Sequence, residues 1–86
     1  EAHPRDRKVL VIDDDEASRY LLNKALRGTR FQVLEASDAK MGIERACAEH
    51  PDVIVLDLVM PGIDGMSAME HLKQDERTRD IPVVIY

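Results

Sequence analysis

Residues 8–15 read KVLVIDDD, in which four apolar residues follow one lysine and run directly into three aspartates. A short, uninterrupted and β-branched apolar run predicts a strand that is buried on both faces of a sheet. The same arrangement returns at residues 53–57, VIVLD, where a second apolar run ends on Asp57. The sequence therefore predicts two central strands that each end on acidic residues.

Two stretches between these strands have helical spacing. Residues 16–27 carry apolar side chains three and four positions apart and are followed by Gly28, a common C-terminal cap. Asp38 is placed to cap a second helix that extends through His50, and Pro51 ends it. The faces expected to turn inward comprise Leu21, Leu22, Ala25 and Leu26 in the first helix and Ala39, Ile43, Ala46 and Cys47 in the second.

Three further elements complete the pattern. Residues 31–35, FQVLE, alternate apolar and polar as an edge strand does, and residues 81–86, IPVVIY, are the fourth expected strand. Between the third and fourth strands, a third helix is expected to turn Met66, Met69 and Leu72 inward. Strands that alternate with helices predict an α/β fold, a three-layer, doubly wound parallel sheet with right-handed crossovers.

The acidic residues at the strand ends are the candidate site. In the flavodoxin-like strand order 2-1-3-4 the first and third strands are neighbours, about 4.8 Å apart, so Asp13, Asp14 and Asp57 converge at one sheet edge. Three close carboxylates repel one another, and a hard divalent cation such as Mg²⁺ or Mn²⁺ relieves this. An aspartate beside such an ion can attack phosphorus. These residues indicate metal-assisted phosphoryl chemistry but do not choose the nucleophile; Asp15 is expected to cap the first helix instead.

Composition restricts the class of protein. The chain has 86 residues, enough for one domain, with 44% hydrophobic residues and a net charge of −5 that argues against direct contact with nucleic acid. Its single cysteine, Cys47, forms no internal disulfide and is expected to be buried. No apolar run approaches the roughly 20 residues of a membrane span, so we expect a cytoplasmic location and no membrane contact. Residues 1–7 are expected to be a linker or ragged terminus, and residues 8–86 the domain.

Two separated motifs resemble those of response-regulator receiver domains, the aspartate-phosphorylated modules of two-component signalling. Residues 9–15, VLVIDDD, are similar to the family's first strand and acidic pair. Residues 53–66, VIVLDLVMPGIDGM, are similar to its phosphorylation loop, in which D-x-x-M-P-x-x-D-G follows an apolar strand. Residues 81–85, IPVVI, resemble its fourth strand, so register and spacing agree across nearly all of residues 8–86.

The resemblance implies a role for individual residues. Asp57 would be the phosphoacceptor, taking a phosphoryl group from a histidine kinase or a histidine phosphotransfer protein. Asp14 would bind Mg²⁺ directly and Asp13 mainly through water, with Asp57 and the main-chain oxygen of Val59 as further ligands. Two loop residues, Pro61 and Gly65, would shape the phosphorylation loop. Such a domain is a signalling module rather than an enzyme and catalyses only its own phosphotransfer and dephosphorylation.

The resemblance also implies what lies outside these residues. The family's switch Thr or Ser follows the fourth strand and its phosphate-binding Lys ends the fifth, so neither is expected in this chain, nor are the fifth strand and the last two helices. One sheet face would then be covered by the first helix alone, leaving Val9, Val11, Val53 and Val55 partly bare. Exposing four such side chains forgoes roughly 6–12 kcal/mol of burial, and we expect the chain to self-associate. The domain is expected within a hybrid histidine kinase or a multidomain response regulator.

Two alternative functions are each compatible with part of the sequence. Asp13 and Asp15 form a D-x-D pair, as in haloacid-dehalogenase-type phosphatases, but that family has Thr or Val where Ala17 stands. A receiver that only docks and is never phosphorylated is the non-enzymatic alternative, which the complete acidic trio disfavours. A P-loop nucleotide-binding site is excluded because no G-x-x-x-x-G-K-[ST] motif is present.

Overall fold

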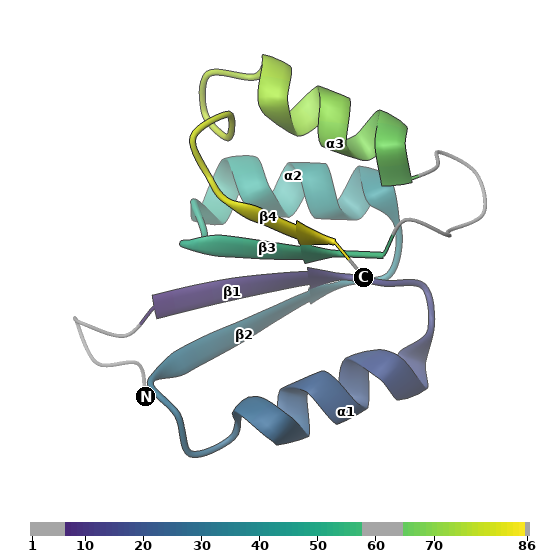
Figure 1. The fold of residues 1–86 in the computed structure, drawn as a ribbon, viewed down its shortest axis with the longest axis vertical. Coiled ribbons are helices and arrows are strands. Elements are labelled where there is room, and N and C mark those ends of the chain that lie inside the picture. Colours follow the sequence, from purple (N-terminus) through teal and green to yellow (C-terminus); the bar gives the residue numbers. More distant parts are fainter. Residues whose placement is uncertain (1–6, 58–64, 86) are drawn as a thin grey trace.

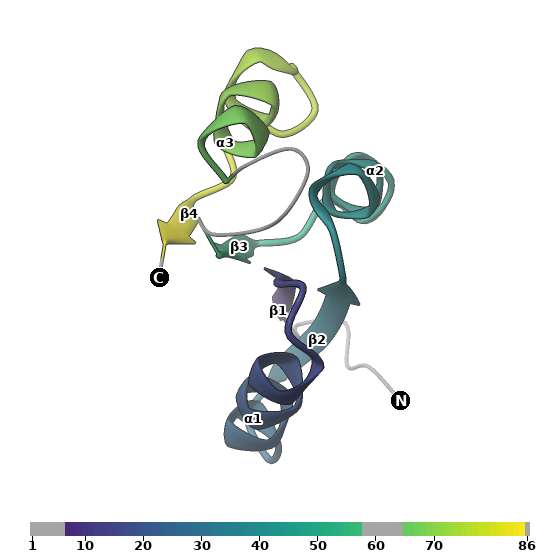
Figure 2. The same ribbon diagram turned by 90° about the vertical axis from the view of Figure 1, so that its right-hand side faces the viewer.

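The structure, a computed structural model, describes residues 7–57 and 65–85. Its elements alternate along the chain: β1 (Arg7–Ile12), α1 (Glu16–Leu26), β2 (Phe31–Ala36), α2 (Ala39–Glu49), β3 (Val53–Leu56), α3 (Gly65–Gln74) and β4 (Val83–Ile85). The strands form one parallel sheet in the order β2-β1-β3-β4. Helices α2 and α3 cover one face of the sheet and α1 covers the other (Figure 1, Figure 2). The predicted three-layer fold and strand order 2-1-3-4 are confirmed.

The helix boundaries follow from local chemistry. Asp15 caps α1 and Asp38 caps α2, each accepting a hydrogen bond from a main-chain N–H of its own helix, as the sequence predicts. The first helix ends one residue earlier than predicted, at Leu26, because Arg27 adopts extended backbone angles. Gly28 follows with φ 87°, a left-handed conformation that glycine adopts without steric cost.

The main core lies between the sheet and the helices α2 and α3. Leu10 and Ile12 of β1 and Ile54 and Leu56 of β3 are fully buried there, and each such side chain contributes roughly 1.5–3 kcal/mol. Gly42 allows α2 to approach closely, since a Cβ atom there would lie 2.5 Å from Cδ1 of Ile12. The end of β1, directly before Asp13, is therefore tightly packed.

The opposite face of the sheet is covered unevenly. The expectation that Val9 and Val11 would be partly bare is wrong, because these central residues lie between β2 and β3 and are 3% and 0% exposed. Val53 and Val55 are half-buried, as predicted, and Val84 of β4 is 53% exposed. Coverage by α1 thus fades toward β4. An open apolar groove of about 310 Å³ results, lined by Val9, Leu22, Ala25, Leu26, Phe31, Val53, Val55 and Val84.

Several expectations about inward-facing residues are wrong. Of the four α1 residues expected to face inward, Leu21 is 64% exposed and Ala25 is also exposed, whereas Leu22 and Leu26 are half-buried. In α3, Met66 is 55% exposed, and the buried face is formed by Ala68 and Leu72, with Met69 partly buried. Cys47 is half-buried rather than buried. The strand expected at residues 81–86 is shorter, Val83–Ile85, and Tyr86 lies outside the described residues.

Within residues 7–57 and 65–85, no helix combines the length and apolar character needed to cross a bilayer.

Candidate functional site

The site lies where β1 and β3 end. Ile12 pairs with Leu56 in the register of these strands, so the next residues, Asp13 and Asp57, emerge side by side. The main-chain N–H of Asp57 donates to the carbonyl oxygen of Ile12 at 3.0 Å. On the other side, the N–H of Asp13 donates to the carbonyl oxygen of Ala36 in β2 at 3.1 Å. The ladder hydrogen bonds therefore continue into the site and hold both acids at fixed positions.

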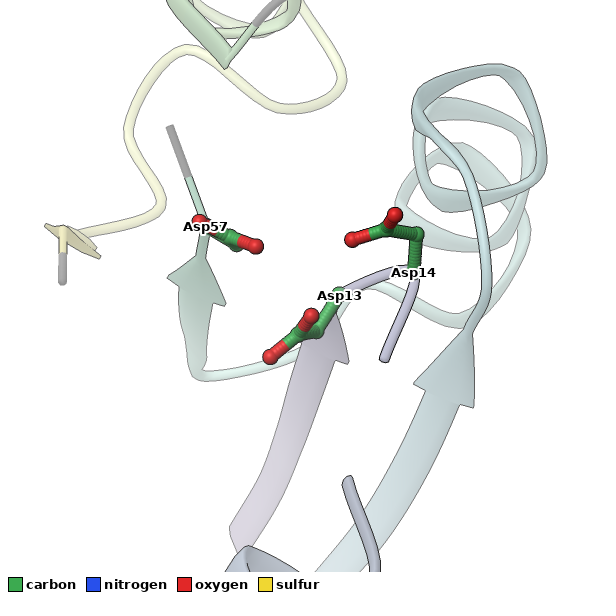
Figure 3. Close-up of side chains that lie close together, drawn as sticks. All are labelled: Asp13, Asp14 and Asp57. Atoms are coloured by element: carbon green, nitrogen blue, oxygen red, sulfur yellow. The ribbon is translucent and has the colours of Figure 1, made fainter. Parts of the chain in front are cut away.

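Three carboxylates converge at this edge. One oxygen from each of Asp13, Asp14 and Asp57 lies within 4.8 Å of the others. Figure 3 shows the side chains of Asp14 and Asp57 directed toward one another, with Asp13 next to both. The juxtaposition predicted from strand order is confirmed.

The three acids differ in their surroundings. Asp13 is 1% exposed, and its Oδ1 accepts the main-chain N–H of Asp15 at 2.9 Å. Asp57 is half-buried and Asp14 is exposed. Asp13 is thus built into the turn between β1 and α1, whereas Asp14 and Asp57 are accessible to a ligand from solvent.

The carboxylate of Asp15 lies outside this cluster. Its carboxylate accepts the Ser18 hydroxyl at 2.8 Å and the Ala17 N–H at 3.2 Å. These hydrogen bonds, the one from Ser18 first, hold the pKa of Asp15 below its usual value. The D-x-D interpretation requires both Asp13 and Asp15 at the reaction centre, so this placement argues against a haloacid-dehalogenase-type site.

The loop after β3 that resembles a phosphorylation loop is described only in part. Val59, expected to supply a main-chain ligand, and Pro61 lie outside the described residues, and Gly65 is the first residue of α3. One contact was not anticipated from sequence: the guanidinium of Arg19 donates from Nη1 to the carbonyl oxygen of Asp13 at 2.6 Å. Its only sequence signal was helical spacing, which places Arg19 one turn after the acids.

The donor set fits a hard divalent ion. Carboxylate oxygens are the ligands that Mg²⁺ and Mn²⁺ prefer, and Mg²⁺ typically takes one or two carboxylates and completes its shell with water and phosphate. Two ligands of one Mg²⁺ lie at most about 4.2 Å apart, so oxygens within 4.8 Å need only small side-chain adjustments. Asp13, Asp14 and Asp57 are therefore a suitable set of ligands.

Comparisons with known proteins agree with this geometry. The family model of the response regulator receiver domain matches residues 9–86. Response regulator PleD of Caulobacter vibrioides is 41% identical over 78 residues, covering 91% of this chain and 17% of PleD. The N-terminal domain of a response regulator receiver protein from Methanoculleus marisnigri superposes with a TM-score of 0.89 at 30% identity, covering 92% of this chain and 64% of that one.

A third similar protein is the receiver domain of sensor histidine kinase PA1611 from Pseudomonas aeruginosa. It has a TM-score of 0.87 at 22% identity, over 93% of this chain and 66% of that one, and its structure has a magnesium ion coordinated in the active-site cleft. The chain belongs to the response regulator receiver domain family of two-component signalling. It spans less than two thirds of the length of PleD and of the Methanoculleus marisnigri chain.

Proposed function

We propose that this chain accepts a phosphoryl group on Asp57, in a reaction that requires Mg²⁺ or Mn²⁺ at the acidic cluster. The observation that carries the proposal is the approach of Asp13, Asp14 and Asp57 to within 4.8 Å at the ends of two adjacent strands. Like charges so close favour a bound cation. A divalent ion would neutralise part of the charge on the incoming phosphoryl oxygens. The magnesium in the cleft of the PA1611 receiver supports this choice of ion.

The residues have separate tasks. Asp14 and Asp13 hold the cation, Asp14 directly and Asp13 mainly through water, with the Val59 carbonyl as a further expected ligand. A carboxylate oxygen of Asp57 forms a bond to phosphorus while the bond from phosphorus to the donor's imidazole nitrogen breaks, and the electron pair stays on that nitrogen. The other ring nitrogen of the donor's phosphohistidine carries a proton, so the histidine leaves in its neutral form, and the second product is an acyl phosphate on Asp57.

The choice of Asp57 as nucleophile rests on burial and on family membership. Asp13 is 1% exposed and accepts the N–H of Asp15, which leaves little room for an incoming phosphoryl group. Asp57 is half-buried at a strand end and begins the D-x-x-M-P-x-x-D-G motif of the family. Asp14 is exposed but falls at the family's metal-binding position.

The proposed partners follow from this chemistry. The phosphodonor is a histidine kinase or a histidine phosphotransfer protein, in the cytoplasm, and the domain is a signalling module rather than an enzyme with an external substrate. No direct contact with nucleic acid or membrane is proposed for this domain. We also propose that the isolated chain self-associates, through the apolar groove and the exposed β4 residue Val84.

Phosphorylation of variants tests the assignment. Two proteins are incubated with acetyl phosphate and Mg²⁺ and analysed by intact mass. One is this chain, and the other is a longer chain that also supplies the switch hydroxyl and the phosphate-binding lysine. We expect one base-labile phosphoryl group on the wild type and none on Asp57→Asn. Asp52→Asn is the matched control, because Asp52 precedes β3 at the opposite end of the same strand; it should still be phosphorylated.

Two outcomes would contradict the proposal. Label that persists in Asp57→Asn, or that maps to Asp13, would move the nucleophile. Absence of label on the longer wild-type chain, even with a cognate kinase, would favour the docking-only receiver.

A further inference from the structure

Arg19 connects the acidic turn to the edge strand β2. Its Nη1 donates to the Asp13 carbonyl oxygen at 2.6 Å, and its Nε donates to Oε1 of Glu35 at 3.1 Å. The side-chain amide of Asn23 donates from Nδ2 to the second carboxylate oxygen of Glu35 at 3.1 Å. The Arg19 side chain is only 15% exposed, so the guanidinium is largely shielded from solvent, whereas the Glu35 side chain is 38% exposed.

The atom that Arg19 contacts gives the network its consequence. The carbonyl oxygen of Asp13 belongs to the same rigid peptide plane as the N–H of Asp14. A hydrogen bond that fixes the direction of this carbonyl also fixes the direction in which the chain leaves toward the Asp14 Cα atom. Asp14 is the exposed member of the cluster, and an exposed side chain has the most freedom to turn away.

Charge balance explains why Arg19 does not simply neutralise the acids. Glu35 lies in β2 and forms an ion pair with the guanidinium. The negative charge of Glu35 therefore offsets the positive charge of Arg19, and the field of Arg19 at the three aspartates is weakened. The planar guanidinium then donates in two directions at once, which a lysine ammonium at the end of a flexible stem does less well. Charge-assisted hydrogen bonds of this kind are about twice as strong as neutral ones.

From these contacts we propose that Arg19, held by Glu35 and Asn23, is a positioning residue that fixes the Asp13–Asp14 peptide plane and keeps Asp14 directed toward Asp57. The proposal deepens the metal-dependent function and rests on it for its consequence in metal binding. The effect of Arg19 on the conformation of the Asp13–Asp14 turn does not depend on metal and can be measured in its absence.

Arg45 provides a matched control. Its Nη1 donates to the main-chain oxygen of Glu35 at 3.0 Å, so Arg45 connects α2 to β2, as Arg19 connects α1 to β2 through the Glu35 carboxylate. It extends from α2, however, and this hydrogen bond is to β2 rather than to the acidic turn. Arg19→Met and Arg45→Met therefore each remove one guanidinium hydrogen bond to Glu35 of β2. Only Arg19→Met also removes the contact with Asp13.

The first measurement is amide hydrogen exchange in metal-free buffer. We expect exchange of the Asp15 N–H, which donates to Asp13 Oδ1, to accelerate about tenfold in Arg19→Met, as for loss of a hydrogen bond to a charged group. It should change less than about twofold in Arg45→Met. Arg19→Lys keeps the charge and the pairing with Glu35 but not the two-directional geometry, so it should restore overall stability more than it restores protection of the turn. Equal exchange in Arg19→Met and Arg45→Met would overturn the proposal.

The second measurement is the affinity for Mn²⁺ by calorimetry. We expect about a tenfold loss in Arg19→Met and little change in Arg45→Met. If the wild type binds Mn²⁺ and Arg19→Met binds it equally well, the positioning role is wrong. If the wild type does not bind Mn²⁺ while the turn still loosens in Arg19→Met alone, the metal-dependent function fails and the positioning role stands.

Discussion

Replacing Asp14 with asparagine should stabilise this protein in the absence of metal. The substitution preserves the shape of the side chain but removes one of three negative charges that lie within 4.8 Å of one another. Two unit charges at that distance repel by about 0.9 kcal/mol in bulk water and by about 3.5 kcal/mol at an effective dielectric of 20. Because Asp14 is exposed, the lower value applies, and relief from two neighbours amounts to about 1–2 kcal/mol.

This gain is measurable for a chain of this size. A change of 1 kcal/mol moves the midpoint of thermal unfolding by about 4–8 °C in a small domain, so Asp14→Asn should melt visibly higher in EDTA. The advantage should shrink with added NaCl, which screens exposed charges. Glu76→Gln is the control: Glu76 is exposed in the turn after α3 and carries the same unit of charge in a chain of net charge −5.

Added Mg²⁺ should reverse the comparison. A bound ion stabilises the folded state by about 1.4 kcal/mol when its concentration is ten times its Kd, and only a protein with the complete cluster benefits fully. As Mg²⁺ is added, the free energy of unfolding of the wild type should therefore rise more than that of Asp14→Asn. That of Glu76→Gln should rise as much as that of the wild type. Unfolding curves in urea, with EDTA and then with Mg²⁺, measure both effects. A variant less stable than the wild type in EDTA, or equal stabilisation of both by Mg²⁺, would refute the reasoning.

Two further predictions concern packing and association. Gly42→Ala should lower the free energy of unfolding by up to about 2 kcal/mol. Overpacking against Ile12 costs about 1–3 kcal/mol, and the higher helix propensity of alanine offsets about 1 kcal/mol of this. A variant that is more stable than the wild type in urea denaturation would contradict this. The isolated chain should sediment as oligomers, and Val84→Lys, which places a charge on the exposed face of β4, should shift it toward monomer. A wild type that is already a monodisperse monomer would remove the argument for association.

The sheet and its acidic edge were predictable because they depend on short-range patterns. Apolar runs at residues 9–12 and 53–56 predict central strands, and the alternation of strands with helices leaves few topologies. Once β1 and β3 are neighbours, their first residues beyond the ladder have to be close. Asp15 was separable from the trio because a side chain one residue before a helix commonly caps it.

The depth of burial was not predictable in the same way. Helical spacing correctly indicates which residues share a face, but Leu21 and Met66 are exposed although both were expected inside. Spacing does not reveal how much partner surface an element finds. Val9 and Val11 show the opposite error: neighbouring strands and α1 enclose them more fully than counting helices suggested.

The tie from Arg19 to Asp13 was missed for a third reason. Its acceptor is a main-chain carbonyl, which every residue has, so no residue type identifies it in the sequence. Glu35 is an acid in an otherwise apolar strand end, VLEA, which suggests an ion pair. The sequence does not indicate which of the scattered basic residues is its partner. Only the position of α1 over β2 brings the guanidinium and both acceptors together.

Repulsion and burial are closely coupled at this site. Each strand-end acid directly follows a fully buried residue, Asp13 after Ile12 and Asp57 after Leu56. Moving the acids apart would require displacing these two side chains, and burial of each contributes roughly 1.5–3 kcal/mol. At an effective dielectric of 20, which suits the buried Asp13 and the half-buried Asp57, two charges 4.8 Å apart repel by about 3.5 kcal/mol. Burial of the two side chains together contributes about 3–6 kcal/mol and offsets this repulsion. The hydrophobic core therefore holds the carboxylates close together before any cation binds, and a cation that does bind meets ligands whose main chain is already in place.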